Sequence, residues 1–259
     1  MELKNRHVAV TGASRGIGRA FAMMCAREQA TLYVVSRKVE EDLIQELKTA
    51  GAKDVIALPG DLTQLSEITR ISDSLKAYPI DILFNNAGAL TGGLIECQSL
   101  AEIHSMLQVN VYALIHLTHQ LLPGMMERKR GKIINNSSVS AYMHFPCAST
   151  YAASKAAVAA FTDCIRQELK GTGVSTLLLI TPGIKTQMFD DIDKLYGQNI
   201  SVPKSSISST KYAEIIREAI LEDLEVLEPE GLTGIGLKVA KLLPRVFESQ
   251  VQKGFRRTK

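Results

Sequence analysis

Several residue types and segments are scarce or missing in this chain of 259 residues. There is no tryptophan, only 7 Phe and 7 Tyr are present, and the 8 prolines lie outside any low-complexity run. This composition excludes a disordered or fibrous protein. No stretch of about eighteen uncharged apolar residues occurs, which excludes a helical membrane span.

Sorting signals and metal-like cysteine patterns are also missing. Met1 is followed at once by charged and polar residues, so we expect no secretory leader. The four cysteines, at positions 25, 97, 147 and 164, have no C-x-x-C or ligand-like spacing. We therefore expect reduced thiols, no metal site and a cytoplasmic location.

The net charge of +3 is distributed unevenly along the chain. Residues 238–259 hold seven basic side chains and one acidic side chain, so this segment carries +6 and residues 1–237 carry −3. A nucleic-acid-binding domain typically has a basic face with aromatic side chains for stacking. The acidic body and the few aromatics therefore argue against a nucleic-acid partner.

Short apolar runs alternate with amphipathic segments over most of the chain. The runs that we expect to be strands lie at 7–10, 32–35, 55–58, 81–84, 132–137 and 175–180, with a last candidate at 224–229. Continuous apolar runs are typical of strands covered on both faces, and helices between them imply parallel βαβ units. We predict an α/β fold with one domain, a Rossmann-type doubly wound parallel sheet with helices on both faces.

Two segments depart from this alternation. Residues 187–210 combine charged and small side chains with a serine-rich stretch, and an insertion of this size is typically a lid or a disordered loop. We expect a catalytic domain at 1–237 that carries this lid, followed by a basic amphipathic segment at 238–259.

A glycine loop follows the first predicted strand and opens the first predicted helix. Gly12, Gly16 and Gly18 would allow a tight turn and close approach of a pyrophosphate to the helix N-terminus. The second strand ends in Ser36 and Arg37 rather than in the carboxylate that binds an NAD ribose. Because Arg15 adds a second guanidinium, and guanidinium groups bind phosphate, the pattern favours NADP over NAD.

A Tyr–Lys pair stands at the start of an alanine-rich segment. Tyr151 and Lys155 are four residues apart, so on a helix they share one face. Ser138 follows the strand at 132–137, at the sheet edge where such folds bind ligands. Asn110 lies in a predicted long helix, where a buried amide indicates either a satisfied core residue or a functional one.

Together these motifs resemble the classical short-chain dehydrogenase/reductase family from about residue 5 to residue 186. The matching elements are the glycine loop, the Asn85-Asn86-Ala87-Gly88 motif, and the order of Asn110, Ser138, Tyr151 and Lys155. The resemblance implies these last four as catalytic residues. It implies as cofactor-binding residues Gly12, Ser14, Arg15, Gly16, Ile17, Gly18, Ser36, Arg37, Asp61, Leu62, Asn86, Ala87, Gly88, Tyr151, Lys155, Pro182, Gly183 and Thr186.

The resemblance also implies a reaction, the interconversion of a ketone and a secondary alcohol with NADP(H). Tyr151 would be the general acid, with its pKa lowered by the Lys155 ammonium and the oxidised nicotinamide. Lys155 would also hold the nicotinamide ribose, Ser138 would hydrogen-bond the substrate oxygen, and Asn110 would seat a water molecule. We expect a reductase of a hydrophobic or 3-oxoacyl-like carbonyl compound.

The C-terminal segment departs from the family ending that buries the chain terminus in a tetramer. Apolar residues recur at every fourth position, with Pro244 kinking or restarting the helix, at Val239, Leu243, Phe247, Val251 and Phe255. This pattern is consistent with a helix packed on its own domain or on a partner subunit. It is also consistent with peripheral contact with anionic lipid.

Assembly and two rival functions complete these expectations. The family forms dimers through the helices predicted at 100–127 and 152–169, which carry extra apolar residues, so we expect a homodimer or homotetramer. The extra residues are Leu114, Ile115, Leu117, Val158 and Phe161.

His144 and Cys147 lie between Ser138 and Tyr151 and are candidates for the substrate pocket. The rival functions are an NAD-dependent alcohol dehydrogenase of the same fold and a non-catalytic NADP-binding regulator.

Overall fold

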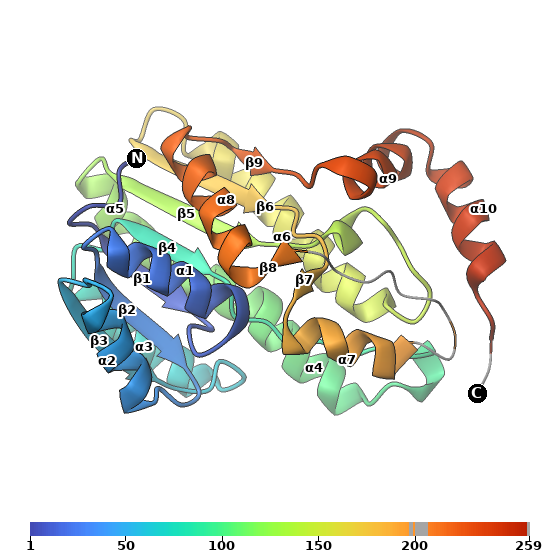
Figure 1. The fold of residues 1–259 in the computed structure, drawn as a ribbon, viewed down its shortest axis with the longest axis horizontal. Helices are drawn as coiled ribbons and strands as arrows, with labels where there is room; N and C mark the ends of the chain where they lie inside the picture. The colour runs from blue at the N-terminus through green and yellow to red at the C-terminus, as the bar shows by residue number, and fades with distance from the viewer. Residues whose placement is uncertain (197–198, 200–206, 258–259) are drawn as a thin grey trace.

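In a computed structural model that describes residues 1–196, 199 and 207–257, the chain folds around one parallel sheet (Figure 1). Its seven strands are β1 (His7–Thr11), β2 (Thr31–Ser36), β3 (Asp54–Pro59), β4 (Ile82–Asn85), β5 (Gly131–Asn136), β6 (Val174–Leu179) and β9 (Val226–Leu227). They are ordered β3-β2-β1-β4-β5-β6-β9, and every pair is parallel. The strand order changes direction between β1 and β4, which is where this architecture binds its ligand.

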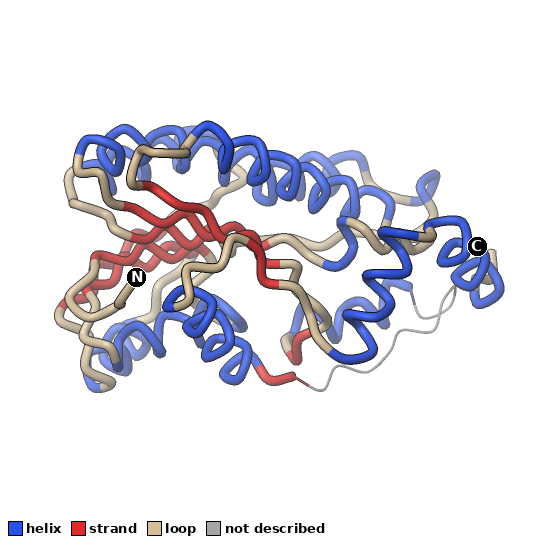
Figure 2. The backbone as a smooth tube through the Cα atoms, turned by 90° about the horizontal axis from the view of Figure 1, so that it is seen from above, coloured by secondary structure: helices blue, strands red, loops and turns tan. Residues whose placement is uncertain are grey.

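Helices cover both faces of the sheet, as Figure 2 shows. The elements are α1 (Gly16–Arg27), α2 (Glu41–Thr49), α3 (Leu65–Lys76), α4 (Leu100–Leu107), α5 (Ala113–Glu127), α6 (Ser149–Glu168), α7 (Gln187–Tyr196), α8 (Ser209–Leu221), α9 (Gly231–Leu242) and α10 (Pro244–Gly254). One core holds α1, α2 and α8 against the sheet through side chains such as Phe21, Leu43 and Ile216. The other holds α3 and α5 through Ile68 and Leu117. The predicted doubly wound α/β fold is confirmed.

The helix predicted over 100–127 is interrupted. Residues Gln108–Tyr112 form a π-helical turn between α4 and α5. Asn110 lies within this widened turn, and its side chain is occupied by hydrogen bonds to a neighbouring loop and to α6. A π-turn inside a helix commonly marks a functional position, and a 3.6-residue periodicity cannot distinguish it from ordinary helix.

The apolar residues expected at a subunit interface are mostly used inside the subunit. Leu114, Leu117 and Val158 are buried, and Phe161 is packed against the core. For Leu114, Leu117 and Val158 the expectation is wrong, because burial within the subunit leaves these side chains almost no surface for a partner. Ile115 alone of the five is exposed.

The two irregular segments contain helices. The predicted lid begins as α7, and a small sheet pairs β7 (Ile184–Lys185) with β8 (Ile207–Ser208). The remainder of the predicted lid, at 197–198 and 200–206, lies outside the described residues. In the C-terminal segment, Pro244 ends one helix and starts the next. Among the described helices, none combines the length and the apolar composition needed to cross a bilayer.

Candidate active site

The predicted site residues gather at one edge of the sheet. Because all seven strands are parallel, their carboxyl ends lie together. Thr11 ends β1, Ser36 ends β2 and Asn85 ends β4. Ser138 follows β5 by two residues, and Thr181 follows β6 by two residues. This edge therefore collects motifs that lie up to 170 residues apart in the sequence.

The glycine loop packs closely against the loop after β4. Gly12 and Gly16 have φ angles of +69° and +58°, which glycine adopts without strain. A Cβ atom on Gly18 would lie 2.3 Å from the Gly12 carbonyl oxygen and 2.5 Å from Asn86 Nδ2. No larger residue fits there, so the sequence allows the first turn of α1 to sit directly against β1 and β4.

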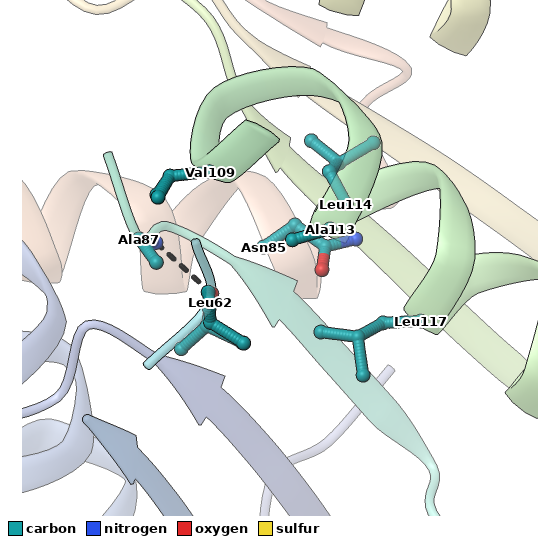
Figure 3. A pocket seen from close by; sticks show the side chains of 8 residues that line it. Leu62, Asn85, Ala87, Val109, Ala113, Leu114 and Leu117 are labelled. Carbon is teal, nitrogen blue, oxygen red and sulfur yellow. Dashed lines mark hydrogen bonds between the residues drawn. The ribbon is translucent and has the colours of Figure 1, made fainter. Parts of the chain in front are cut away.

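Thr11 holds the Asn85–Gly88 segment in place. Its Oγ1 accepts hydrogen bonds from the backbone N–H groups of Asn86 and Ala87, both at 2.9 Å. Asn86 Nδ2 donates back to the Thr11 carbonyl at 3.0 Å. Ala87 and Leu62, two predicted cofactor residues, line a small pocket with Val109, shown in Figure 3. The sequence interpretation did not include Thr11, although its position at a strand end could have indicated it.

The residues expected to select the cofactor lie beside the glycine loop. The N–H groups of Gly12 and Ala13 donate to the Val35 carbonyl, which brings the loop against the end of β2. Ser36 is buried, whereas Arg37 is exposed just beyond it. Arg15 is exposed too, and its guanidinium donates to Gln187 Oε1 of α7 at 2.6 Å. The contact joins the loop to the predicted lid.

The other predicted residues on this side also lie at the carboxyl edge. Asp61 follows β3 and accepts a hydrogen bond from the Thr63 N–H at 3.0 Å. Ser14 precedes α1, and Ile17 lies in its first turn. Arg15, at the N-cap of α1, makes no side-chain capping hydrogen bond, and the first turn of the helix contains no acidic residue. The amide groups at this helix end therefore suit a phosphate.

Tyr151, Lys155 and Ser138 are brought together on α6 and the loop before it. Burial raises the pKa of the Tyr151 phenol to about 12, while its hydrogen bond with Ser138 acts in the opposite direction. Burial lowers the pKa of the Lys155 ammonium to about 8. The Lys155 Nζ atom lies 5.6 Å from the centre of the Tyr151 ring. The pair shares one helix face, as its spacing predicts.

Asn110 joins this group through backbone contacts. Its Oδ1 accepts from the Ala89 N–H at 2.8 Å, and its Nδ2 donates to the Ala89 carbonyl and to Ser154 Oγ, both at 3.0 Å. A Cβ atom on Gly88 would lie 3.5 Å from Asn110 Oδ1 and 3.9 Å from Lys155 Nζ. Gly88 therefore keeps open the space between the amide and the ammonium.

Asn136 is a central member of the site that the sequence interpretation missed. Its carbonyl accepts a hydrogen bond of 2.8 Å from Lys155 Nζ. Its side chain donates to Asn86 Oδ1 at 3.0 Å and accepts from Thr181 Oγ1 at 2.5 Å. The residue thus ties β5 to the loops after β4 and β6 and positions Lys155. An asparagine at the end of an apolar strand is the signal that could have identified it.

The turn after β6 approaches the glycine loop. A Cβ atom on Gly16 would lie 3.3 Å from Thr186 Cγ2, so these two predicted cofactor residues face each other. Gly183, next to Pro182, leaves room for the Phe189 ring of α7, which a Cβ atom there would approach to 2.4 Å. Close packing at this glycine brings the described part of the predicted lid onto the turn.

An apolar cluster lies on the loops that hold Leu94 and the residues just before Tyr151. Leu94, Cys147 and Ala148 are buried there, and Phe255 from the C-terminal segment packs against them. Arg257 pairs with Glu96 at 2.6 Å, which fastens the chain end to the same loops. Cys147, a candidate for the substrate pocket, is buried in this cluster. The return of Phe255 to this cluster was not predicted.

A dinucleotide fits these residues. The glycine loop forms a cradle that Cβ atoms would fill, the N-terminus of α1 suits a pyrophosphate, and the Lys155 ammonium stands beside Gly88. A carboxylate is absent from the end of β2. Among the described residues, no group of three or more His, Cys, Asp and Glu side chains could hold a metal ion.

Comparison with known proteins agrees with this geometry. The sequence profile of the short chain dehydrogenase family matches residues 6–196. A ketoacyl reductase, HetN, from Nostoc sp. is 38% identical over 255 residues, which cover 93% of this chain and 86% of that protein.

Solved structures show the same fold. A putative NAD(P)-dependent gluconate 5-dehydrogenase from Beutenbergia cavernae with bound NADP is 26% identical, with a TM-score of 0.75 over 83% of this chain and 89% of its own. A short-chain dehydrogenase from Sphingobium yanoikuyae in complex with NADPH has a TM-score of 0.78 at 23% identity and covers 98% of both chains. The chain belongs to the short-chain dehydrogenase/reductase family of oxidoreductases.

Proposed function

We propose that this protein reduces a hydrophobic ketone to a secondary alcohol with NADPH. The observation that carries the proposal is the convergence of Ser138, Tyr151 and Lys155 beside the glycine loop. Reduction of a carbonyl requires a hydride at carbon and a proton at oxygen. NADPH supplies the hydride when bound, and the protein's own side chains supply and control the proton.

Tyr151 is the proton donor in this proposal. A phenol whose pKa is raised to about 12 stays protonated at neutral pH, as a general acid requires before the reaction. After it donates from Oη to the substrate oxygen, the phenolate must be stabilised. The Lys155 ammonium, 5.6 Å from the ring centre, supplies a positive charge on the same side. The sequence predicts a Tyr151 pKa lowered by the Lys155 ammonium, whereas in the structure burial raises this pKa; that expectation is wrong for the protein without its cofactor.

Ser138 and Asn110 act beside this pair. Ser138 hydrogen-bonds Tyr151, so the same hydroxyl can hold the substrate oxygen within reach of the phenol. The Asn110 side chain forms hydrogen bonds with Ala89 and Ser154, and these bonds hold the π-turn against α6. We propose that a water molecule seated there returns a proton toward Lys155. Asn136 is a positioning residue that holds the ammonium through its carbonyl.

NADPH is proposed over NADH because of charge at the end of β2. Ser36 and Arg37 stand where an NAD-binding chain would carry an acid, and Arg15 lies in the adjacent loop. A guanidinium forms charge-assisted hydrogen bonds with a 2′-phosphate. The gluconate 5-dehydrogenase structure from Beutenbergia cavernae contains bound NADP, which supports this choice.

The substrate class is proposed from the cluster of Leu94, Cys147 and Phe255, which includes residues just before Tyr151 in the chain. These apolar side chains suit the chain of a hydrophobic or 3-oxoacyl-like ketone more than a polar sugar. The relative from Nostoc is named a ketoacyl reductase, which supports the same class.

The experiment measures NADPH and NADH oxidation by the purified protein over a series of ketones, from short β-keto esters to long-chain acyl and polycyclic ketones. Turnover with NADPH should rise with chain length and disappear in Tyr151→Phe, while that variant keeps cofactor binding. Preference for NADH would favour the dehydrogenase alternative. Tight NADPH binding without turnover of any ketone would favour a binding protein and contradict the proposal.

Organisation and assembly form the remaining part of the proposal. Residues 1–237 would be the catalytic domain with a lid at 187–210, and residues 238–259 a separate basic segment. We propose a cytoplasmic homodimer or homotetramer, for which Leu107, Tyr112 and Ile115 offer exposed apolar side chains on the α4–α5 region. Sedimentation velocity of the intact protein tests the assembly.

A further inference from the structure

Helix α9 carries apolar side chains on two opposite sides. Gly234, Leu237 and Ala240 are buried, so one side packs on the domain. The other side is open: Leu232 is 88% exposed and Leu242 is 77% exposed, and both are accompanied by further exposed apolar side chains. We call this open surface the outer ridge; it consists of Leu232, Ile235, Leu242, Leu243 and Val246. Several exposed apolar side chains within one short segment typically mark an interaction surface.

The charged side chains within residues 231–247, which contain the outer ridge, are all basic. No Asp or Glu occurs from residue 231 to residue 247. Lys238 and Arg245 are exposed beside the ridge, and neither makes an ion pair with a described residue. Lys241, in contrast, pairs with Glu228 and lies 4.3 Å from the centre of the Tyr142 ring, so it is held against the domain. The outer ridge therefore combines apolar side chains with unpaired cations.

The arm formed by α9 and α10 is held to the body by its inner side. Phe247 of α10 packs edge-on against Phe145 at a ring-centre distance of 5.6 Å, and Phe255 joins the apolar cluster of the substrate-side loops. None of the described side chains of α10 is fully buried. Figure 1 shows the arm extending beyond the carboxyl end of the sheet, at the same end as the candidate active site. These contacts hold the arm without using the outer ridge.

We propose that the outer ridge docks on the surface of an anionic lipid bilayer. Such a surface offers both an apolar layer for the leucines and negative headgroups for Lys238 and Arg245. The acidic body, which carries −3 over residues 1–237, leaves the arm as the positively charged part. A second copy is a poorer occupant, because a two-fold contact would bring the same cations together, and residues 231–247 contain no Asp or Glu to neutralise them.

Docking in this way places the candidate active site at the membrane end of the molecule. The arm and the carboxyl edge of the sheet lie at one end (Figure 1). The docking surface does not depend on the proposed function, since it involves none of the residues proposed for cofactor or substrate. If the ketone is hydrophobic, the arrangement brings the enzyme to the phase in which its substrate accumulates.

The test is co-sedimentation of the full-length protein with vesicles. One set contains phosphatidylcholine alone, and the other contains about 30% phosphatidylglycerol, which gives a negative surface. We expect the protein to sediment with the anionic vesicles. Leu232→Ser/Leu242→Ser should weaken this binding by about tenfold or more, because each leucine loses apolar contact. Lys238→Glu/Arg245→Glu should weaken it by at least about tenfold through charge.

Leu100→Ser is the matched control, since Leu100 is 83% exposed on α4, outside the arm. It should sediment like the unaltered protein. The proposal is overturned if the unaltered protein does not bind anionic vesicles, or if both double variants bind as well as it does. It is also overturned if the ridge substitutions dissociate an oligomer while vesicle binding is absent, which would make the ridge an interface between copies. NADPH oxidation with a water-soluble ketone, measured without vesicles, tests the proposed function separately.

Discussion

Replacing Lys155 by methionine should make the protein more stable at neutral pH. The ammonium is buried in α6, and burial lowers its pKa from 10.5 to about 8. At pH 7 the folded protein therefore holds a charge that the unfolded chain solvates better, a penalty of about 3 kcal/mol at 1.36 kcal/mol per pKa unit. Methionine removes this penalty and fills a similar volume.

One lost interaction reduces the gain. The Lys155 ammonium donates to the Asn136 carbonyl at 2.8 Å, and the loss of that hydrogen bond costs about 1–2 kcal/mol. We expect Lys155→Met to raise the free energy of unfolding by about 2 kcal/mol at pH 7. The same variant should have no ketone reduction, because the phenolate of Tyr151 loses its cation.

The pH dependence of the free energy of unfolding tests whether the Lys155 ammonium is desolvated. Between the folded pKa of about 8 and the unfolded pKa of 10.5, the unfolded chain binds more protons at this residue, so the stability of the unaltered protein rises with pH. From pH 7 to about pH 9.5 the free energy of unfolding of the unaltered protein should rise by about 2 kcal/mol, and that of the variant should not. The stability difference should therefore shrink to about zero at the higher pH.

Urea denaturation at both pH values measures this difference, with Lys170→Met as the control. Lys170 is exposed in the turn after α6, so its replacement should leave the pH dependence unchanged. A gap between Lys155→Met and the unaltered protein that stays constant with pH would refute the reasoning. It would mean that the ammonium is not desolvated in the folded state.

Three further predictions concern the glycine loop, the cofactor and a buried cation. Gly18→Ala should weaken NADPH binding by about tenfold or more, because the added Cβ atom would clash with the Gly12 carbonyl. Fluorescence titration measures this binding. The control is Gly254→Ala, which has open space around the added Cβ atom and should bind NADPH normally. Arg37→Glu should raise the ratio of the KM for NADPH to the KM for NADH by about 10- to 100-fold, because the 2′-phosphate loses its guanidinium partner. The control is Lys38→Ala: Lys38 already pairs with Glu40, so its replacement should change this ratio little. Asp223→Asn should lower the free energy of unfolding by about 2–4 kcal/mol above pH ~4, because buried Lys132 loses its carboxylate partner 2.6 Å away. Protonation of Asp223, whose pKa Lys132 helps to lower, should abolish that difference as the pH falls. Unchanged stability in Asp223→Asn relative to Glu222→Gln would contradict the pairing.

Local pattern was sufficient for the architecture of this protein. Runs such as Thr31–Ser36 are apolar along their whole length, because both faces of a parallel strand are covered by helices. The ends of these runs predict where the strands end. They therefore also predict the carboxyl edge of the sheet, at which Ser36, Asn86 and Ser138 lie. Glycine positions were equally informative, since Gly12 and Gly18 occupy places that no larger residue could fill.

Contacts between distant segments required the tertiary structure. Nothing in the local sequence links Asn136 to Lys155 or Thr11 to Asn86, because these hydrogen bonds form only when separate strands end side by side. The same limit explains why Leu114, Leu117 and Val158 were assigned to a subunit interface: periodicity identifies an apolar face but not what covers it.

The C-terminal arm shows both sides of this division. Its sequence alone determined that Pro244 separates two helices and that positive charge collects after residue 237. Only the folded structure decided that Phe255 returns to the loops beside Tyr151 while Leu232 and Leu242 remain in solvent. The physical reason is that the apolar composition of a segment sets how much free energy is gained when the segment is removed from water. Tertiary packing decides which of its apolar side chains are covered within the chain.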